Sequence, residues 1–298
     1  MRYLVIRPLI VGLFIALLAA AAAAQAESRP LLLPEMSHPE IQAYLKTSDM
    51  LLVPLGSIEQ HGTHLPLGTD SYEALALATE ISRRTGIVVA PLAWVGYSEY
   101  HNGYPGTVSV STETLAQFLF ECCEGLVRQG FRRILFFNYH GGNSTAQTLV
   151  IHRINHGTPA VAVAIGVGGS LKVEAEEEFL DWHAGVGETS IMLHLRPELV
   201  RMDRAEKPVL HFTPETAALV EKAKTDPRLE AVLSGRLGVP AATGKGGTSR
   251  ELSSTGVWSF SDPKAATAAR GARECQAWVD AAVSFINAWR GGRIGVGR

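Results

Sequence analysis

Residues 59–70, which read Glu-Gln-His-Gly-Thr-His-Leu-Pro-Leu-Gly-Thr-Asp, hold the side chains best suited to chemistry. Glu59, His61 and Asp70 offer two carboxylates and an imidazole within twelve residues. Divalent ions such as Zn²⁺ and Mn²⁺ accept this mixture of ligands. Asp70 alone could instead cap a helix, and His64 suits a supporting or structural role better than that of a ligand. The segment therefore predicts a metal site with Glu59, His61 and Asp70 as candidate ligands.

A second candidate ligand is His140, in the run Asn138-Tyr-His-Gly-Gly-Asn143. Taken alone, His140 could be a core histidine at the end of a strand. The two glycines that follow weaken this interpretation, because they cost chain entropy without packing against anything. A Gly-rich turn could also cradle phosphate, but the spacing of a phosphate-binding loop and its lysine are absent. A ligand role is the more specific prediction for His140.

Two further polar clusters are each weak evidence for a functional site when taken alone. Residues 181–190 contain His183 and Glu188, and the Glu could simply complement the dipole of a helix that begins there. Residues 97–107 read as a polar loop with several tyrosines and glycines. Neither cluster contains a Gly-x-Ser-x-Gly nucleophile motif, so serine-hydrolase chemistry is not supported.

The elements that must position these residues alternate between strand-like and helix-like segments, which predicts a parallel sheet covered by helices in one α/β domain. Both loops that carry His and Gly follow predicted strands, and ligands of parallel sheets bind at the carboxyl ends of strands. The less periodic residues 201–261 are expected to form a long excursion over the site. The predicted strands are 50–55, 87–91, 133–138 and 160–167, and the predicted helices are 70–84, 112–129, 143–156, 187–195 and 265–289.

The N-terminus has the layout of a secretory signal peptide. Arg2 and Arg7 precede the apolar run 9–24, and Ala24-Gln-Ala26 reads as a cleavage site. The run has 16 residues, whereas a bilayer span needs about 20; an uncleaved anchor is the alternative. The prediction is a signal peptide at residues 1–26, a metal hydrolase domain at 27–298, and a periplasmic or secreted protein that has no membrane attachment after cleavage.

Charge and cysteine content exclude some classes of protein. The formal net charge of the chain is −2, and a mildly acidic chain has no electrostatic basis for binding nucleic acid. Cys122, Cys123 and Cys275 are too few and too poorly spaced for a thiolate zinc site. We expect them to be buried free thiols.

Taken together and in this order, the four polar segments resemble the creatininase family (creatinine amidohydrolase and its relatives). The resemblance spans residues 51–263 and implies a three-layer α/β/α sandwich with a mostly parallel sheet. It also implies a binuclear metal centre and a homo-oligomer, with a hexamer as one expected form. The matching segments are 54–66 with Asp70, 104–107, 138–143, 183–190, 254–257 and 262–263.

The resemblance assigns roles residue by residue. It implies that Glu59, His61, Asp70 and His140 are metal ligands, with Asp70 between two metals, and that His183 donates and accepts the proton. Creatinine hydrolases carry a Glu two residues after the ligand histidine, where this chain has Gly142. We expect Glu188 to replace that carboxylate. The residues expected to contact substrate are Ser98 and Tyr139.

The chemistry implied is metal-dependent hydrolysis. Two divalent ions, Zn²⁺ and/or Mn²⁺ with Fe²⁺ as a further option, lower the pKa of a water molecule and polarise a carbonyl group. The expected substrate is a small molecule whose C–N bond belongs to a cyclic or similar non-peptide amide. The alternatives are a formamide deformylase, a peptide-cleaving relative, and a secreted metal-binding protein without catalytic activity.

Overall fold

The computed structural model describes residues 29–167, 169, 171, 173 and 180–291. The predicted signal peptide, residues 1–26, lies outside the described residues. The elements are, in chain order, β1 Leu31–Leu32, α2 His38–Leu45, β2 Met50–Leu55, α3 Thr69–Thr85, β3 Val88–Val89, α4 Thr112–Gln129, β4 Arg133–Asn138, α5 Ser144–Gly157, β5 Val161–Ala164, α6 Val186–Leu195, α7 Pro214–Ala223, α8 Glu230–Arg236, α9 Ser249–Leu252 and α10 Ala268–Gly291.

The five strands form one sheet in the order β1-β3-β2-β4-β5, and all neighbouring pairs are parallel. The register between β2 and β4 places Leu55 beside Asn138 at the carboxyl ends of the two strands. Because these residues immediately precede the two loops that carry His and Gly, both loops leave the sheet at the same edge. The sheet itself thus brings the two halves of the predicted site together.

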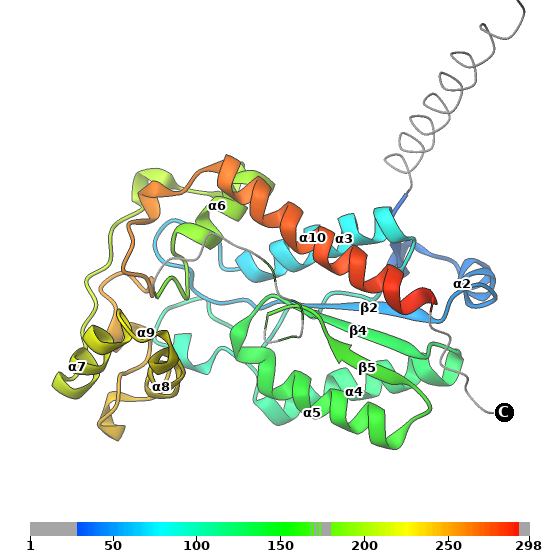
Figure 1. Ribbon diagram of the computed structural model, residues 1–298, viewed down its shortest axis with the longest axis horizontal. Helices are drawn as coiled ribbons and strands as arrows, with labels where there is room; N and C mark the ends of the chain where they lie inside the picture. Colours follow the sequence, from blue (N-terminus) through cyan, green and yellow to red (C-terminus); the bar gives the residue numbers. More distant parts are fainter. Residues whose placement is uncertain (1–28, 168, 170, 172, 174–179, 292–298) are drawn as a thin grey trace, which may run out of the picture.

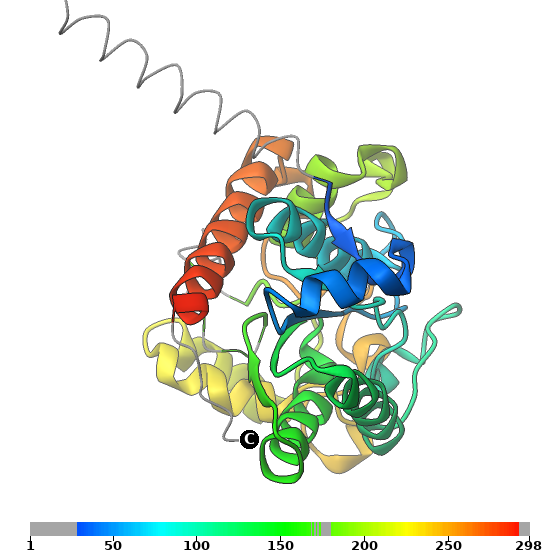
Figure 2. The same ribbon diagram turned by 90° about the vertical axis from the view of Figure 1, so that its right-hand side faces the viewer.

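Successive side chains of β2 point to opposite faces of the sheet. Leu51, Val53 and Leu55 pack with α4 and α5 in one core, whereas Met50 and Leu52 pack with α3 and α10 in the other. All six residues of β2 and of β4 are buried, as expected for strands covered on both faces. Helices α3, α6 and α10 therefore form one layer and α4 and α5 another (Figures 1 and 2). The predicted three-layer α/β/α sandwich is confirmed.

Several predicted elements have the bounds that the sequence indicated. Helix α4 begins after Ser111, whose side chain accepts a hydrogen bond from the Thr114 amide, and ends at Gly130. The structure adds β1 and α2, which the sequence pattern did not reveal. It also reduces the predicted strand 87–91 to Val88–Val89, the two residues that pair with β1 on one side and with β2 on the other.

The 201–261 excursion contains α7, α8 and α9 and lies at the end of the sheet toward which β2 runs (Figure 1). A small apolar core around Val220 and Leu233 includes Leu180 and so joins the excursion to the segment before α6. Throughout the described ranges, none of the helices combines the length and apolar character needed to span a bilayer. The three cysteines are free, as predicted, but Cys122 is exposed because it lies on the outer face of α4.

Candidate metal centre

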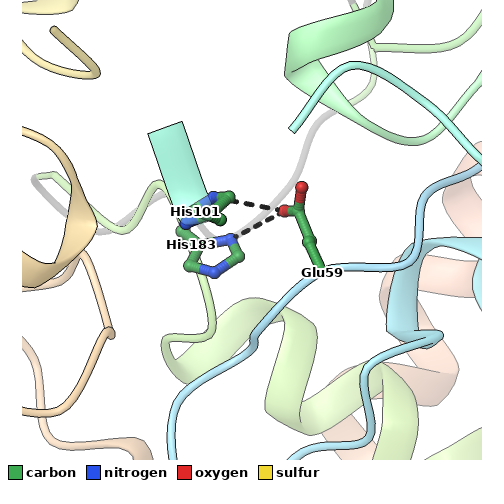
Figure 3. Close-up of side chains that lie close together, drawn as sticks. All are labelled: Glu59, His101 and His183. Carbon is green, nitrogen blue, oxygen red and sulfur yellow. Dashed lines mark ion pairs between the residues drawn. The ribbon is translucent and has the colours of Figure 1, made fainter. Parts of the chain in front are cut away.

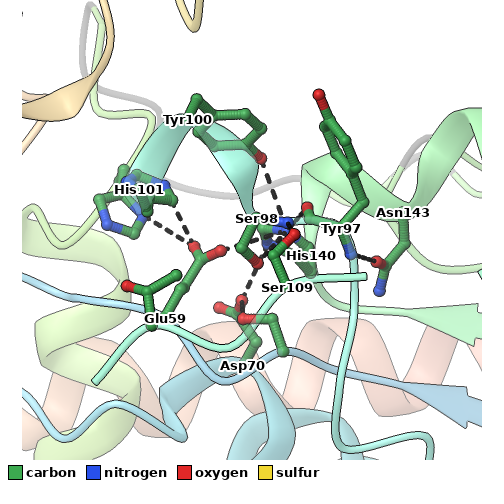
Figure 4. Close-up of polar contacts among 12 residues, drawn as sticks. Glu59, Asp70, Tyr97, Ser98, Tyr100, His101, Ser109, His140 and Asn143 are labelled. Carbon is green, nitrogen blue, oxygen red and sulfur yellow. Dashed lines mark hydrogen bonds and ion pairs between the residues drawn. The ribbon is translucent and has the colours of Figure 1, made fainter. Parts of the chain in front are cut away.

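The loops after β2 and β4 and the turn before α6 enclose a cavity of about 510 Å³. Carboxylates and imidazoles from the predicted site lie on one side of this cavity, and the 201–261 excursion closes the other side. Figure 4 shows the polar cluster at its base. The described lining residues are Glu59, Asp70, Tyr97, Tyr100, His101, Tyr139, His140, Gly141, Gly142, Thr145, Trp182, His183, Glu188, Ser234, Leu237, Gly238 and Trp258.

Asp70, in the first turn of α3, lies between two histidines from different loops. Its Oδ1 is 3.0 Å from His61 Nε2, and its Oδ2 is 3.0 Å from His140 Nδ1. Ser57 Oγ donates a hydrogen bond of 2.6 Å to Oδ2 and orients the carboxylate. Burial raises the pKa of Asp70, but the two imidazoles outweigh it and hold this pKa well below its usual range. An ionised carboxylate that faces two separate donor groups is suited to bridging two cations.

Glu59 is completely buried, and neither of its carboxylate oxygens has a hydrogen-bond partner. Oε2 lies 3.2 Å from His140 Nε2, and Oε1 lies 3.3 Å from His101 Nε2 and 3.5 Å from His183 Nδ1 (Figure 3). A buried carboxylate without hydrogen bonds is costly unless a cation compensates its charge. The donor set around Glu59 therefore fits a divalent metal ion.

The cluster divides into groups whose ligand atoms lie within 4.8 Å of one another. Each group contains three side chains. Asp70 contacts His140 of the group that includes Glu59, and His61 of the group that includes Glu188. Those two groups together contain all five predicted ligands, with Glu188 Oε2 at 3.7 Å from His61 Nε2. The groups are Glu59, Asp70 and His140; His61, His183 and Glu188; and Glu59, His101 and His183.

The turn that carries His183 contains a strained residue and is held in place by hydrogen bonds. Ala184 has φ of 54°, a conformation that non-glycine residues adopt mainly where the surroundings impose it. Its amide donates a 2.6 Å hydrogen bond to Glu188 Oε2, so the strained residue and the predicted ligand hold each other in place. Asp181 accepts hydrogen bonds from the Val186 and Gly187 amides at the start of α6.

The electrostatics of the two histidines beside Asp70 differ from those of His183. Burial lowers the pKa of His61 and His140, but the neighbouring carboxylates outweigh it and raise these values to about 10 and about 9. At His183, burial and the neighbouring rings of His101 and His61 hold the pKa well below its usual value. His183 is therefore neutral, whereas His61 and His140 carry protons that a bound cation would displace.

The two predicted substrate contacts have different positions. Tyr139 lines the cavity. Ser98 is completely buried and is absent from the described lining; its Oγ lies 3.4 Å from His140 Nε2. The geometry thus gives Ser98 a contact with a candidate ligand, and its contact with substrate stays a prediction. His64 bonds to Thr189 through Nε2 at 2.8 Å, in agreement with the supporting role expected for it.

His101 is the functional candidate that the sequence did not identify. It ends the short 3₁₀ helix Glu99–His101, and its Nδ1 contacts Ser249 Oγ of α9. The amide of Gln60 lies 3.0 Å from the same nitrogen. The available signal was its place in the loop 97–107, next to the segment 104–107 that carries the family resemblance. The contact with Ser249 spans 148 residues of sequence and has no local signature.

Comparisons with known proteins agree with this geometry. The family model described as "Creatininase: Creatinine amidohydrolase" matches residues 34–286. The chain is 34% identical over 254 residues to a mycofactocin precursor peptide peptidase from Mycolicibacterium smegmatis, over 83% of this chain and 88% of that protein. It is 30% identical over 220 residues to a creatinine amidohydrolase from Pseudomonas putida, over 66% of this chain and 85% of that protein.

A solved structure named "Creatininase Mn" superposes on the fold with a TM-score of 0.66 and 25% identity. The match covers 89% of this chain and 100% of the solved chain. The family match over most of the sequence, the shared fold and the clustered carboxylates and histidines all support one assignment. The chain belongs to the creatininase family.

Proposed function

We propose that the protein is an exported hydrolase with a binuclear metal centre, which cleaves the C–N bond of a cyclic amide or a similar small amide. The observation that carries this proposal is the position of Asp70, whose two oxygens each lie 3.0 Å from a histidine of a different donor group. A single carboxylate shared in this way could contact both cations of a two-metal site.

Glu59, Asp70 and His140 would hold one cation, and His61, Asp70 and Glu188 the other. Mixed imidazole and carboxylate ligands suit Zn²⁺ and Mn²⁺, and Fe²⁺ also fits them. When bound, the two cations supply Lewis acidity that lowers the pKa of water and polarises the amide carbonyl. Glu188 would thereby provide the carboxylate that Gly142 cannot.

His183 is positioned to move the proton. Its Nε2 lies 2.7 Å from the Gln60 carbonyl oxygen, and its Nδ1 lies on the other side of the ring, 3.5 Å from Glu59 Oε1. Nδ1 accepts a proton from the attacking water as the new C–O bond forms, and then delivers this proton to the leaving nitrogen as the C–N bond breaks. Such general acid–base catalysis is typically worth about 10²–10⁴-fold in rate.

The walls of the cavity favour an uncharged organic substrate. Aromatic rings from Tyr97, Tyr100, Trp182 and Trp258 line it, and its described lining contains no Lys or Arg. The volume of about 510 Å³ is within the range of roughly 300–1,000 Å³ that is usual for small-molecule sites. No cationic side chain of the described lining would therefore pair with an anionic substrate, whereas a neutral ring can stack on the walls.

A peptide-cleaving activity is the second candidate, because a peptide peptidase is 34% identical to this chain over most of its length. A formamide deformylase would use the same centre. The test is metal analysis of the purified protein followed by hydrolysis assays, with and without a chelator, on creatinine, other cyclic amides, formamides and short peptides. Turnover confined to cyclic amides and abolished by chelation supports the proposal, and turnover confined to peptides supports the second candidate. Two bound metals without turnover on this panel would indicate a catalytically silent metal-binding protein.

Export rests on the N-terminal sequence pattern. Expression of the full chain in a Gram-negative host, followed by fractionation and mass spectrometry, should recover a periplasmic protein that begins at Glu27. A protein that retains residues 1–26 and sediments with membranes would instead show that this segment is an anchor.

Assembly into a homo-oligomer is the remaining part of the proposal. Leu67, Trp94 and Val108 are between 38% and 48% exposed, although each is a large apolar side chain. They lie on loops around the site, and burial between subunits would remove them from water. Light scattering coupled to gel filtration gives the number of subunits, and a monomeric mass would contradict this part of the proposal.

A further inference from the structure

Gly142 marks a place where three polar atoms converge. A Cβ atom added to this residue would lie 2.5 Å from His140 Nε2 and 2.6 Å from Tyr100 Oη, and closer still to the carbonyl oxygen of Tyr97. Real Cβ atoms essentially never approach another atom within 3.0 Å. The space that a side chain at position 142 would need is therefore occupied, and the phenol of Tyr100 is one of the groups that fill it.

The ring of Tyr100 is held on several sides by other rings. Its centroid lies 4.5 Å from that of His101, 5.8 Å from that of Trp258 and 6.0 Å from that of Tyr97. Figure 4 shows its hydroxyl directed toward His140, above the carboxylates of Glu59 and Asp70. Tyr100 lines the same cavity as these residues, so its hydroxyl is fixed at the candidate metal centre.

Within the described part of the chain, the hydroxyl of Tyr100 makes one polar contact. The partner atom in that contact does not accept the hydroxyl hydrogen. That contact is with His140 Nε2 at 3.5 Å. His140 Nε2 itself donates to the Tyr97 carbonyl oxygen at 2.8 Å, and a carbonyl oxygen can only accept. Since Nε2 carries the hydrogen of that bond, Tyr100 Oη can only accept from it, and its own hydrogen remains available to a molecule in the cavity.

We propose that the Tyr100 hydroxyl is a further catalytic group, which donates a hydrogen bond to the carbonyl oxygen of the bound amide. Negative charge gathers on this oxygen as water adds to the carbonyl carbon, and a donor held in place beforehand stabilises it most at that stage. The hydrogen stays on Tyr100 throughout, so the step transfers no proton. A phenol, whose usual pKa is about 10, carries this hydrogen at neutral pH.

This inference rests on the proposed function, and it can be tested separately from it. Methylphosphonate is a tetrahedral anion that resembles the adduct of water and an amide, and its binding requires no turnover. We compare the Mn²⁺-loaded wild-type protein, Tyr100→Phe and the control Tyr72→Phe by calorimetry, after measuring the metal content of each. Tyr72 packs edge-on against Trp94 and is absent from the described lining of the cavity.

A hydrogen bond to a charged group is worth about 10- to 150-fold in affinity. Tyr100→Phe should therefore bind methylphosphonate at least about 10-fold more weakly at unchanged metal content, and Tyr72→Phe should bind it like the wild type. Equal affinity of all three proteins, a loss of metal from Tyr100→Phe, or no binding to the wild type would each overturn the inference. With a substrate from the hydrolysis panel, kcat of Tyr100→Phe should fall by about 10²–10³ with KM changed little. If no amide is hydrolysed, the proposed function fails, while the phosphonate comparison still decides the role of Tyr100.

Discussion

His183 Nε2 lies 2.7 Å from the main-chain carbonyl oxygen of Gln60 and 3.0 Å from the side-chain amide nitrogen of the same residue. Gln60 thus contacts the imidazole through both its main chain and its side chain, and these contacts leave Nδ1 at 3.5 Å from Glu59 Oε1. Gln60 stands between Glu59 and His61 in the sequence. The loop that carries two candidate ligands thus also orients the group that would move the proton.

His183→Ala tests whether this histidine moves protons or binds metal. We expect the variant to keep both metal ions and to lose about 10²–10⁴-fold in kcat, the usual contribution of a general acid–base group. His152→Ala, which removes an exposed histidine of α5, should change neither quantity. Metal analysis of both variants decides the matter: a loss of one ion per subunit from His183→Ala would make His183 a ligand in the group with His61 and Glu188.

Asp70→Asn should remove metal and activity together. The substitution keeps the shape of the side chain but removes the charge that both donor groups share, and it also weakens the contact with Ser57. We expect metal content below half of the wild-type value and no measurable turnover. Asp280→Asn, which alters an exposed carboxylate paired with Arg84, is the matched control. Full occupancy and activity in Asp70→Asn would exclude a bridging role.

Much of the fold was predictable because it follows from local patterns. The continuous apolar runs gave β2 and β4 with the observed bounds, and Ser111 and Gly130 mark the ends of α4. Strand β1 has two residues, which is too short for any periodicity to appear, and β3 was predicted over 87–91 but has only two residues. Their pairing depends on tertiary contacts that the sequence does not display.

The residues of the candidate site likewise include some that local sequence patterns indicated and some that they did not. His61 and His140 could be proposed from the sequence because each lies in a loop that follows a predicted strand and is itself followed by Gly. The placement of His101 depends on contacts with Ser249 and Gln60 that link distant parts of the chain. The burial of Ser98 beside His140 could not be predicted, because burial within a loop cannot be read from its composition.

Gly142→Ala should damage the site, whereas Gly141→Ala should not. A Cβ at position 142 would lie 2.5 Å from His140 Nε2, so the ring of this candidate ligand must move. A Cβ at position 141 meets nothing within 4 Å. We expect Gly142→Ala to bind Mn²⁺ at least about 10-fold more weakly, because changes next to metal ligands typically cost about 10- to 100-fold in affinity. Similar Mn²⁺ affinities in titrations of the two variants would show that the convergence at Gly142 does not position the ligand.

The binding of metal should release protons and should strengthen as the pH rises. In the metal-free protein the pKa of His61 is raised from 6.5 to about 10 and that of His140 to about 9. A raised pKa means that the protonated ring stabilises the folded chain, so this contribution is complete below pH 6.5 and is lost as the pH rises through 9 to 10. Because a cation needs the unprotonated nitrogen, its affinity should increase across the same window.

We expect calorimetry at pH 7.5, in two buffers of different ionisation enthalpy, to show release of at least one proton per subunit. The Tm of the metal-free protein should also fall between pH 6.5 and 10, and that of the metal-saturated protein should fall less. Metal uptake without proton release would mean that these two histidines are already neutral at pH 7.5 and that the neighbouring carboxylates do not raise their pKa values.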